Sequence, residues 1–253
     1  MSHHIVAVTE LEYQYPDGTH ALNGINFMIH HGESVAIVGA NGAGKSTLLL
    51  HLNGYHTPQQ GTVQIGDFPV TKQTLPEVRR TVGMVFQDPD DQLFMPTVMD
   101  DVAFGPRNLN LPEETVQQKV TAALAQVDAL HLKDRPPHRL SGGEKRAVAI
   151  ASVLSLAPNI LVMDEPSTGL DPHARRMLIK RLASFSHTKI IATHDLDLVL
   201  DLCLRTIVIH DGRVMADGPT EEIFQDDALL AASHLERPLR MQGCPVCGGG
   251  EIA

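Results

Sequence analysis

SVAIVGANGAGKSTLLLHLNG, residues 34–54, is the stretch that decides the fold. Its first residues, Ser34–Gly39, form a short apolar run typical of a fully buried strand, and helix-forming residues after the glycine-rich loop end at Gly54. A strand, a GxxxxGK[ST] loop and a helix in this order form a P-loop, whose backbone N–H groups surround phosphate oxygens. The sequence therefore predicts a nucleoside triphosphate site, with Lys45 at the β- and γ-phosphates and the Ser46 hydroxyl on Mg²⁺.

The composition indicates a protein with one large core that does not bind nucleic acid. The chain has 253 residues, 43% of them hydrophobic, and a formal net charge of −10 without a dense Lys/Arg block. Three cysteines give no disulfide framework, which favours a reducing compartment. The N-terminus lacks the regions of a signal peptide. The uncharged run 147–163 contains Pro158-Asn159, so we expect a helix, a turn and a strand there and a soluble chain.

Strand and helix patterns alternate along the chain. IVAVTELEYQY and ALNGINFMIHHGE predict two strands joined by a YPDG turn, and TVQIGD, TVGMVFQ, NILVMDE and KIIATHD predict further strands. RTIVIHDGRVMADG predicts a hairpin with Asp211-Gly212 at its turn. The pattern indicates an α/β nucleotide-binding core interrupted by a helical insertion. We expect the core at 1–87 and 158–218, the helical subdomain at about 88–157, and a C-terminal extension at 219–253 that ends in a disordered CPVCGGG tail.

A pair of acids follows one of the predicted buried strands. ILVMDEP places Asp164 and Glu165 at the strand's end, where carboxylates are costly unless they are paired or bound to a metal. Asp164 suits a Mg²⁺ site, and Glu165 suits the base that orients the attacking water. The alternative is a pair of solvated acids that open a turn before Pro166. Because Lys45 lies in the same chain, hydrolysis is the better interpretation.

LSGGEKR, residues 140–146, predicts a helix start with an unusual composition. Ser141 followed by Glu144 forms a capping box. Gly142 and Gly143 weaken a helix without an evident structural gain, so we expect the backbone here to lie close to another group. Helix N-termini attract anions, which makes a phosphate one such group.

The P-loop, LSGGEKR, ILVMDEP, STGLD and ATHD occur in the order seen in ATP-binding-cassette (ABC) ATPases, which the chain resembles over about residues 5–225. The resemblance implies an ABC ATPase domain over residues 1–230: a P-loop NTPase core with an N-terminal antiparallel β subdomain and an inserted α-helical subdomain. It also implies that two such domains pair head to tail, with the LSGGEKR helix of one facing the ATP of the other. The family usually carries Gln where this chain has Glu144, and the capping box accounts for that residue.

The resemblance carries site roles over residue by residue. Tyr15 would stack on adenine, the alternative being a strand tyrosine packed on the core. Gln87 would sense Mg²⁺ and the attacking water, and His194 would contact the γ-phosphate. Asp171 would cross the dimer interface, the alternative being an N-cap before Pro172. The expected catalytic residues are Glu165, His194 and Gln87; the expected Mg²⁺ ligands are Ser46, Gln87 and Asp164; the expected ATP-binding residues are Tyr15, Gly39, Asn41, Gly42, Ala43, Gly44, Lys45, Ser46, Thr47, Ser141, Gly142, Gly143 and Asp171.

FQDPDDQLFMPTVMDDVAFGPRNL, residues 86–109, resembles the ATPases of energy-coupling-factor importers, especially those for cobalt and nickel, and YPDG points the same way. The resemblance implies that Asp90, Asp91, Gln92 and Phe94 lie near a groove for the coupling helices of a membrane subunit. The alternative is an ordinary loop and helix start.

The resemblance thus implies an ATPase subunit, using ATP and Mg²⁺, that energises nickel or cobalt import from the cytoplasmic face of the cell membrane. We expect a homodimer, or a heterodimer with a paralogous ATPase, held peripherally by a transmembrane coupling subunit and substrate-binding membrane subunits, without nucleic acid. Alternatives are a shared vitamin-importing module, a soluble cassette protein of translation or DNA repair, and a lone P-loop kinase. Cys244 and Cys247 have metal-ligand spacing, but one such pair is more typical of an unstructured thiol pair.

Overall fold

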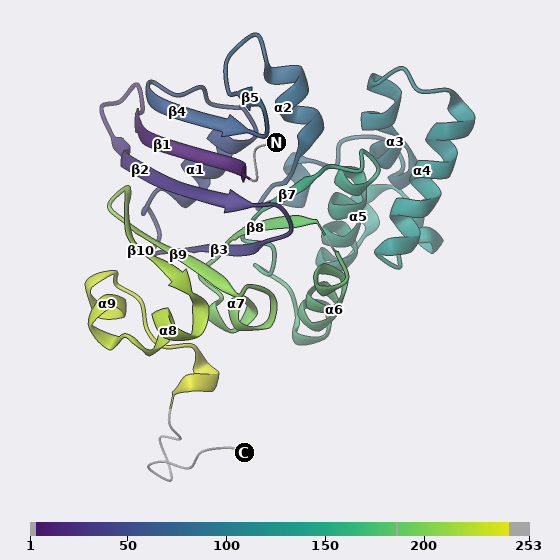
Figure 1. Cartoon of the computed structure of the whole chain (residues 1–253). Helices are drawn as coiled ribbons and strands as arrows, with labels where there is room; N and C mark the ends of the chain where they lie inside the picture. The colour runs from purple at the N-terminus through teal and green to yellow at the C-terminus, as the bar shows by residue number, and fades with distance from the viewer. Residues whose placement is uncertain (1–3, 186, 243–253) are drawn as a thin grey trace.

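The fold consists of two β-sheets with helix α1 (Lys45–Leu52) between them (Figure 1). The computed structural model describes residues 4–185 and 187–242. The smaller sheet is antiparallel, in the order β2-β1-β4-β5: β1 (His4–Gln14), β2 (His20–His30), β4 (Gln60–Ile65) and β5 (Phe68–Pro69). The larger sheet has the order β10-β9-β3-β8-β7-β6: β3 (Ser34–Val38), β6 (Val82–Val85), β7 (Ile160–Asp164), β8 (Thr188–Ala192), β9 (Arg205–His210) and β10 (Arg213–Pro219).

The larger sheet is parallel except for the β9-β10 hairpin, and both of its faces are covered. Every residue of β6, β7 and β8 is buried, as expected for parallel strands between two layers. Alternate side chains serve opposite faces. Ile37, Val162 and Ile190 pack with α1 and the antiparallel sheet, whereas Met163 and Ile191 pack with the helices on the other side.

The remaining helices form two groups. α3 (Val98–Asn108), α4 (Glu113–Gln126) and α5 (Gly142–Leu154) stand together at one side of the molecule, and α2 (Leu75–Thr81) lies near the antiparallel sheet (Figure 1). α6 (Pro172–Ala183), α7 (Leu196–Leu202), α8 (Thr220–Gln225) and α9 (Asp227–Ala232) contribute to the same hydrophobic cluster as the larger sheet. The C-terminal elements therefore pack on the main core.

The structure confirms most predicted elements. Each predicted strand is present, Gly18 donates its N–H to the Tyr15 carbonyl in the YPDG turn, and Asp211 and Gly212 have φ of 46° and 71° in the hairpin turn. The short β5 and α2 were not predicted. The CPVCGGG segment lies outside the described residues. Within residues 4–185 and 187–242, no helix is long and apolar enough to cross a membrane.

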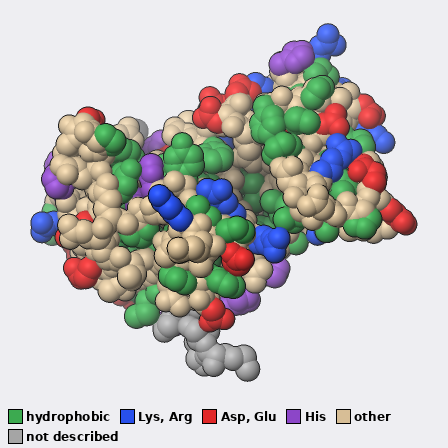
Figure 2. All heavy atoms as spheres, turned by 90° about the horizontal axis from the view of Figure 1, so that it is seen from above, with side chains coloured by type: hydrophobic (Ala, Val, Ile, Leu, Met, Phe, Trp, Pro, Cys, Tyr) green, Lys and Arg blue, Asp and Glu red, His purple; other side chains and the backbone are tan. Residues whose placement is uncertain are grey.

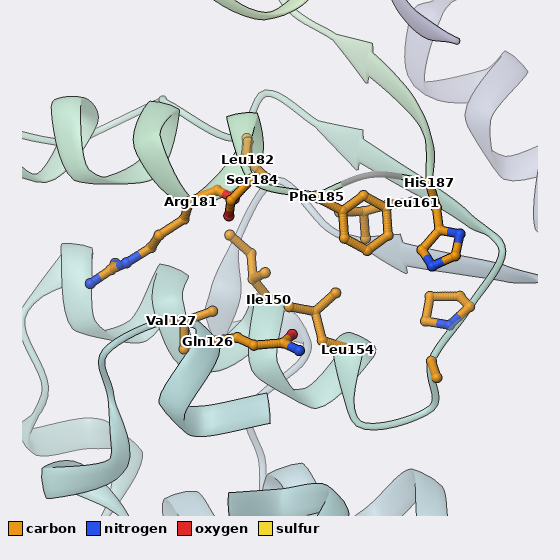
Figure 3. A pocket seen from close by; sticks show the side chains of 12 residues that line it. Gln126, Val127, Ile150, Leu154, Leu161, Arg181, Leu182, Ser184, Phe185 and His187 are labelled. Carbon is orange, nitrogen blue, oxygen red and sulfur yellow. The ribbon is translucent and has the colours of Figure 1, made fainter. Parts of the chain in front are cut away.

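A cavity of about 370 Å³ is lined by residues of α4, α5 and α6 (Figure 3). Ile150 and Leu154 on α5 line it from one side, and Arg181 and Leu182 line it from α6. None of the described residues that line it belongs to the predicted site, so the cavity is not the expected nucleotide pocket.

His51, in the last turn of α1, is fully buried. Its Nδ1 lies 2.8 Å from the Thr47 carbonyl oxygen, and its ring contacts Tyr13 edge-on at 4.7 Å between centroids. Within residues 4–185 and 187–242, its Nε2 has no hydrogen-bond partner. Burial lowers the pKa of His51 from 6.5 to about 4, since the imidazolium would lose its hydration.

His51 should therefore make the protein less stable in mild acid. The unfolded chain takes up a proton below its pKa of 6.5 whereas the folded chain does not, so stability falls between pH 6.5 and about 4. The difference between these pKa values corresponds to about 3 kcal/mol. We expect His51→Phe to shrink the loss of unfolding free energy between pH 7 and pH 4 by about this amount, measured by urea denaturation. His138→Phe, at an exposed histidine, is the control and should keep the wild-type pH dependence; equal pH dependence in both variants contradicts the assignment.

Candidate functional site

The glycine-rich loop after β3 is shaped by close backbone approaches. A Cβ added at Gly39 would lie 2.2 Å from the Ile209 carbonyl oxygen, so only glycine fits beside β9. Gly44 has φ of 104° and would bring a Cβ within 2.5 Å of the Ala21 carbonyl oxygen. The loop therefore packs against β9 and β2 while leading into α1.

Lys45 opens α1 and its ammonium turns back into the loop. Nζ donates to the carbonyl oxygens of Gly39 at 2.8 Å and Ala40 at 3.1 Å, and it lies 4.0 Å from Glu165 Oε1. Burial lowers the pKa of Lys45, an effect that the carboxylates of Glu165 and Asp164 oppose. The ammonium thus stands between the loop backbone and the acidic end of β7.

Asp164 ends β7 beneath the loop, and its buried carboxylate suits a cation. Burial raises the pKa of Asp164, while a hydrogen bond from Ser46 acts against that rise. Its Oδ1 has no hydrogen-bond partner among the described residues. Oxygen ligands are those that Mg²⁺ prefers, so the Asp164 carboxylate and the Ser46 hydroxyl fit that ion. The described residues hold no group of three His, Cys, Asp or Glu that would bind a metal by themselves.

Glu165 is held by the loop that follows β8. Its Oε2 accepts hydrogen bonds from Thr193 Oγ1 at 3.0 Å and from the His194 N–H at 3.3 Å, and it lies 2.9 Å from His194 Nδ1. The backbone of Glu165 has φ of 44°, a left-handed conformation that costs a non-glycine residue about 1–2 kcal/mol. The turn thereby places this carboxylate beside Lys45 and His194.

Gln87 lies in the loop that follows β6, which is the third loop at a strand end to contribute to the site. Arg146 on α5 donates to the Phe86 carbonyl oxygen at 2.7 Å and to that of Gln87 at 2.6 Å. Burial lowers the pKa of Arg146, and the negative charges of Asp88 and Asp164 act against this lowering. The Gln87 segment is therefore tied to the LSGGEKR helix, although sequence analysis gave Arg146 no role.

Lys45, Glu165, His194 and Gln87 line one cavity of about 390 Å³, whereas Gly39, Ala43 and Asp164 do not belong to its described lining. Tyr15 lies at its edge, where its hydroxyl shares a 2.9 Å hydrogen bond with Thr47 Oγ1. Of the residues expected from sequence, the cavity is lined by Tyr15, Asn41, Gly42, Gly44, Lys45, Ser46, Thr47, Gln87, Glu165 and His194; Thr19, His20, Ala21 and Thr168 also line it and were not expected.

The LSGGEKR residues lie at a different surface. Ser141 and Gly143 line a hollow of about 270 Å³ with Asp171, and none of the described residues lines both this hollow and the Lys45 cavity. The predicted capping box is confirmed: Ser141 Oγ accepts from the Glu144 N–H at 3.3 Å, and Glu144 Oε2 accepts from the Ser141 N–H at 2.7 Å. One chain thus presents the two groups of predicted ATP-binding residues separately.

The two glycines of LSGGEKR, Gly142 and Gly143, which we call the signature glycines, were expected to bring no structural gain to the helix. This expectation is wrong for Gly143. A Cβ there would lie 2.9 Å from Ala174 Cβ, so glycine lets the start of α5 approach α6. Gly142 is different, because its nearest atom would be the Gly169 carbonyl oxygen at 4.0 Å. Only Gly142 is left without a packing reason inside the chain.

Asp171 caps α6, which was the alternative to an interface role. Its Oδ1 accepts the N–H groups of His173 at 2.8 Å and Ala174 at 2.9 Å. The hydrogen bond from Ala174 contributes most to lowering the pKa of Asp171. The same loop is joined to the His194 loop by Arg175, whose Nε and Nη2 donate to the Asp195 carboxylate at 2.7 and 2.8 Å. This pair could not be predicted from a local motif, because its partners are 20 residues apart.

An apolar groove runs between α3 and the end of α1, and we call it the Phe94 groove. Phe94 and Phe104 meet edge-on at 5.0 Å between centroids, and both are exposed. Asp101 fixes the Phe94 loop by accepting the N–H groups of Phe94 at 2.9 Å and Met95 at 3.0 Å. The groove has a volume of about 510 Å³ and is also lined by Tyr55, Arg79 and Gln92. Figure 2 shows hydrophobic side chains gathered where the α3–α4 lobe meets the rest of the molecule.

Two of the four residues expected near such a groove line it, Gln92 and Phe94. Asp90 and Asp91 do not belong to its described lining. Asp90 instead accepts from Lys145 Nζ at 2.6 Å, because the loop after Gln87 folds back on α5. Gln92 is half-buried, and its side chain donates to the Ala149 carbonyl oxygen and accepts from the Phe86 N–H.

The chain is similar to ABC transporter proteins over nearly its whole length. Residues 22–168 match the family described as ABC transporter. A Geobacter sulfurreducens protein whose name gives an ABC transporter ATP-binding role and no substrate is 70% identical, over 98% of this chain and 100% of that protein. The energy-coupling factor transporter ATP-binding protein EcfA of Methanocaldococcus jannaschii is 46% identical over 93% of this chain and 86% of that protein.

Solved structures share the same architecture. The cbiO1 protein of Clostridium perfringens, part of the ABC transporter complex cbiONQ, superposes with a TM-score of 0.80 at 42% identity, covering 91% of this chain and 94% of that chain. An ATP-binding cassette solved as a dimer in a post-hydrolysis state with ADP and phosphate gives a TM-score of 0.77 at 26% identity, covering 85% of this chain and 98% of that one.

The two signature glycines should differ in their effect on stability. We expect Gly143→Ala to lower the free energy of unfolding by about 1–2 kcal/mol, since the clash with Ala174 outweighs the gain in helix propensity. Gly142→Ala should leave it unchanged or raise it by up to about 1 kcal/mol. Urea denaturation of both variants measures this, and equal values for the two positions contradict the packing assigned to Gly143.

Proposed function

Because this chain belongs to the ABC transporter family, as the ATP-hydrolysing subunit of an energy-coupling-factor type transporter, we propose that it powers the import of a transition-metal ion, nickel or cobalt. The observation that carries the catalytic part is the convergence of Lys45, Asp164, Glu165 and His194 at the ends of β3, β7 and β8. Loops at the carboxyl ends of neighbouring parallel strands are where α/β proteins bind their ligands.

Each residue of this cluster has a proposed part in hydrolysis. The backbone N–H groups of the loop and Lys45 bind the β- and γ-phosphates, and Tyr15 stacks on adenine. Glu165 orients the attacking water and takes its proton, while His194, held 2.9 Å from Glu165, contacts the γ-phosphate. Mg²⁺ bound by Ser46, with Asp164 and Gln87 beside it, would neutralise phosphate charge. The buried walls strengthen these electrostatic contacts.

The separate LSGGEKR surface supports head-to-tail pairing with a second ATPase subunit. A phosphate in the Lys45 cavity would receive the N–H groups at the start of α5 from the other subunit. Ser141 and Gly142 are exposed there, and among the described residues the nearest atom to a Cβ on Gly142 would be the Gly169 carbonyl oxygen at 4.0 Å. The proposed partner is a second copy of this chain or a paralogous ATPase.

The Phe94 groove is the proposed docking site for a coupling helix of the membrane subunit. Exposed aromatic side chains that line a hollow are the usual anchors of protein interfaces. The groove also adjoins the nucleotide side, since Phe86 lines it one residue before Gln87. Through Gln92 and Arg146 the groove is linked to α5, so docking and the LSGGEKR surface share one helix. In this proposal, docking at the groove holds the subunit peripherally at the cytoplasmic face of the membrane.

Nickel or cobalt as the transported substrate is supported by the resemblance of residues 86–109 to metal-importing members of the branch. The experiment is to isolate the chain from solubilised membranes and identify the proteins that co-purify, followed by nickel and cobalt uptake in cells with and without the chain. One coupling subunit with a single dedicated partner, and ion uptake that depends on the chain, is the expected result. Several substrate-binding subunits would indicate a shared vitamin module, and recovery without any membrane protein contradicts a transporter role.

The same isolation tests the groove. We expect Phe94→Asp to reduce recovery of the membrane subunit about tenfold, because a charge placed among docking side chains must lose its hydration; tenfold corresponds to about 1.4 kcal/mol. Phe68→Asp is the matched control: this residue is 39% exposed on β5, compared with 62% for Phe94, and does not line the groove. Equal recovery with the two variants contradicts docking at the Phe94 groove.

A further inference from the structure

The chain returns to the nucleotide side after α9, through residues 236–242, which we call the C-terminal strap. The backbone N–H groups of Leu239 and Arg240 donate to the two oxygens of the Asp197 carboxylate, at 3.0 and 3.1 Å. Asp197 lies in the first turn of α7. A single carboxylate therefore fastens the strap to the beginning of that helix.

The Arg240 side chain reinforces the same attachment. Nε donates to Asp197 Oδ1 at 3.2 Å, and Nη2 donates to the Asp197 carbonyl oxygen at 2.6 Å. Nη1 lies 3.0 Å from Asp201 Oδ1, one turn further along α7. Hydrogen bonds between charged partners are stronger than neutral ones, and Arg240 makes them along the length of the helix.

The start of α7 is also the end of the His194 loop. Asp195 caps the helix by accepting the Leu198 N–H at 2.9 Å, and its carboxylate is bound by Arg175 and by Ser167 Oγ at 3.1 Å. Residues 194–197 are thus held from one side by α6 and the STGLD loop, and from the other by the strap. A hollow of about 530 Å³, lined by His194, Ser167, Asp197 and strap residues, lies between these supports.

His194 depends on these supports because burial does little to hold its ring. The side chain is 62% exposed, and the ring nitrogen lies 2.9 Å from Glu165 Oε2. A largely exposed ring takes its position from its backbone, which continues directly into Asp195 and α7. Misplacing a catalytic group by about 1 Å can reduce a rate by up to about a hundredfold.

We propose that the C-terminal strap positions His194 for ATP hydrolysis, with Asp197 and Arg240 as positioning residues that do not touch the nucleotide. The inference rests on the proposed role of His194. Loss of the Arg240 contacts frees the start of α7 on one side, so that His194 and Glu165 meet less often in the geometry that hydrolysis needs. We expect nucleotide binding by the glycine-rich loop and Lys45 to stay intact, since none of these residues lines the hollow beside the described part of the strap.

The test compares two arginines of the strap in the full-length chain. Arg240→Ala should lower kcat for ATP about tenfold and leave KM and the binding of a fluorescent ATP analogue within about twofold. Arg237→Ala is the control. Its Nε and Nη2 bind the Asp227 carboxylate on α9 at 2.6 and 2.8 Å, so it removes an equivalent ion pair without touching α7. Arg237 lines the same hollow as His194, but its side-chain hydrogen bonds to described residues go to Asp227 and Gln225 and not to α7, so this variant should keep wild-type kcat.

Two further variants separate positioning from general destabilisation. Arg240→Lys can still pair with Asp197 and should recover part of kcat, whereas Asp197→Ala combined with Arg240→Ala should be no slower than the slower single variant. Equal kcat for Arg240→Ala and Arg237→Ala overturns the inference, as does a loss that appears in KM instead of kcat. A wild-type chain that binds ATP without hydrolysing it would instead refute the proposed function.

Discussion

The structure depends on four charged side chains that are buried together at the end of the parallel sheet. Lys45 and Arg146 supply positive charge, and Asp164 and Glu165 supply negative charge. Burial moves the pKa of Lys45 and Arg146 down and that of Asp164 up, so each group is stable there only because of the opposite charges around it. Removing one partner from such a set leaves an uncompensated buried charge, which is strongly destabilising.

This electrostatic constraint explains where the surrounding elements lie. Lys45 can reach the acids because β3 and β7 flank β8, which brings the glycine-rich loop and the acidic turn to the same edge of the sheet. Arg146 on α5 can donate to the carbonyl oxygens of Phe86 and Gln87 only because α5 lies against the segment after β6. These hydrogen bonds connect the LSGGEKR helix to Gln87. The Phe94 groove is bounded by this same junction. Arg146 interacts electrostatically with Asp164, donates to the carbonyl oxygen of Phe86 in the Phe94 groove, and lies on the LSGGEKR helix.

The sequence predicts the catalytic and binding residues of the site better than the long-range contacts that hold their loops in place. Lys45, Ser46, Asp164, Glu165 and His194 follow buried strands in local motifs, and parallel strands bring their ends together. The supports come from contacts distant in sequence: Arg146 with Phe86, Arg175 with Asp195, and Arg240 with Asp197. A charged residue on a helix surface has no pattern that reveals its partner, so these pairs could not be predicted.

Gly143 and Asp90 each belong to a motif that was recognised in the sequence, but each also has a structural role that the motif does not predict. Gly143 occurs in a motif that implies phosphate binding, yet its missing side chain also lets α5 pack on Ala174. Asp90 stands in the segment assigned to membrane contact, yet it pairs with Lys145, 55 residues away. In both cases the deciding neighbour is set by the tertiary fold. The short β5 and α2 were missed for a related reason, because they contain too few residues for a periodic pattern.

The measurement that tests the account most directly is ATP turnover by Glu165→Gln in the full-length chain, together with ATP binding. The amide keeps the shape of the side chain and cannot take a proton from water. The account predicts turnover at least about a hundredfold lower than wild type, with ATP binding retained. Turnover within a few-fold of wild type would show that Glu165 is not the base, and would contradict the role assigned to the buried charges around it.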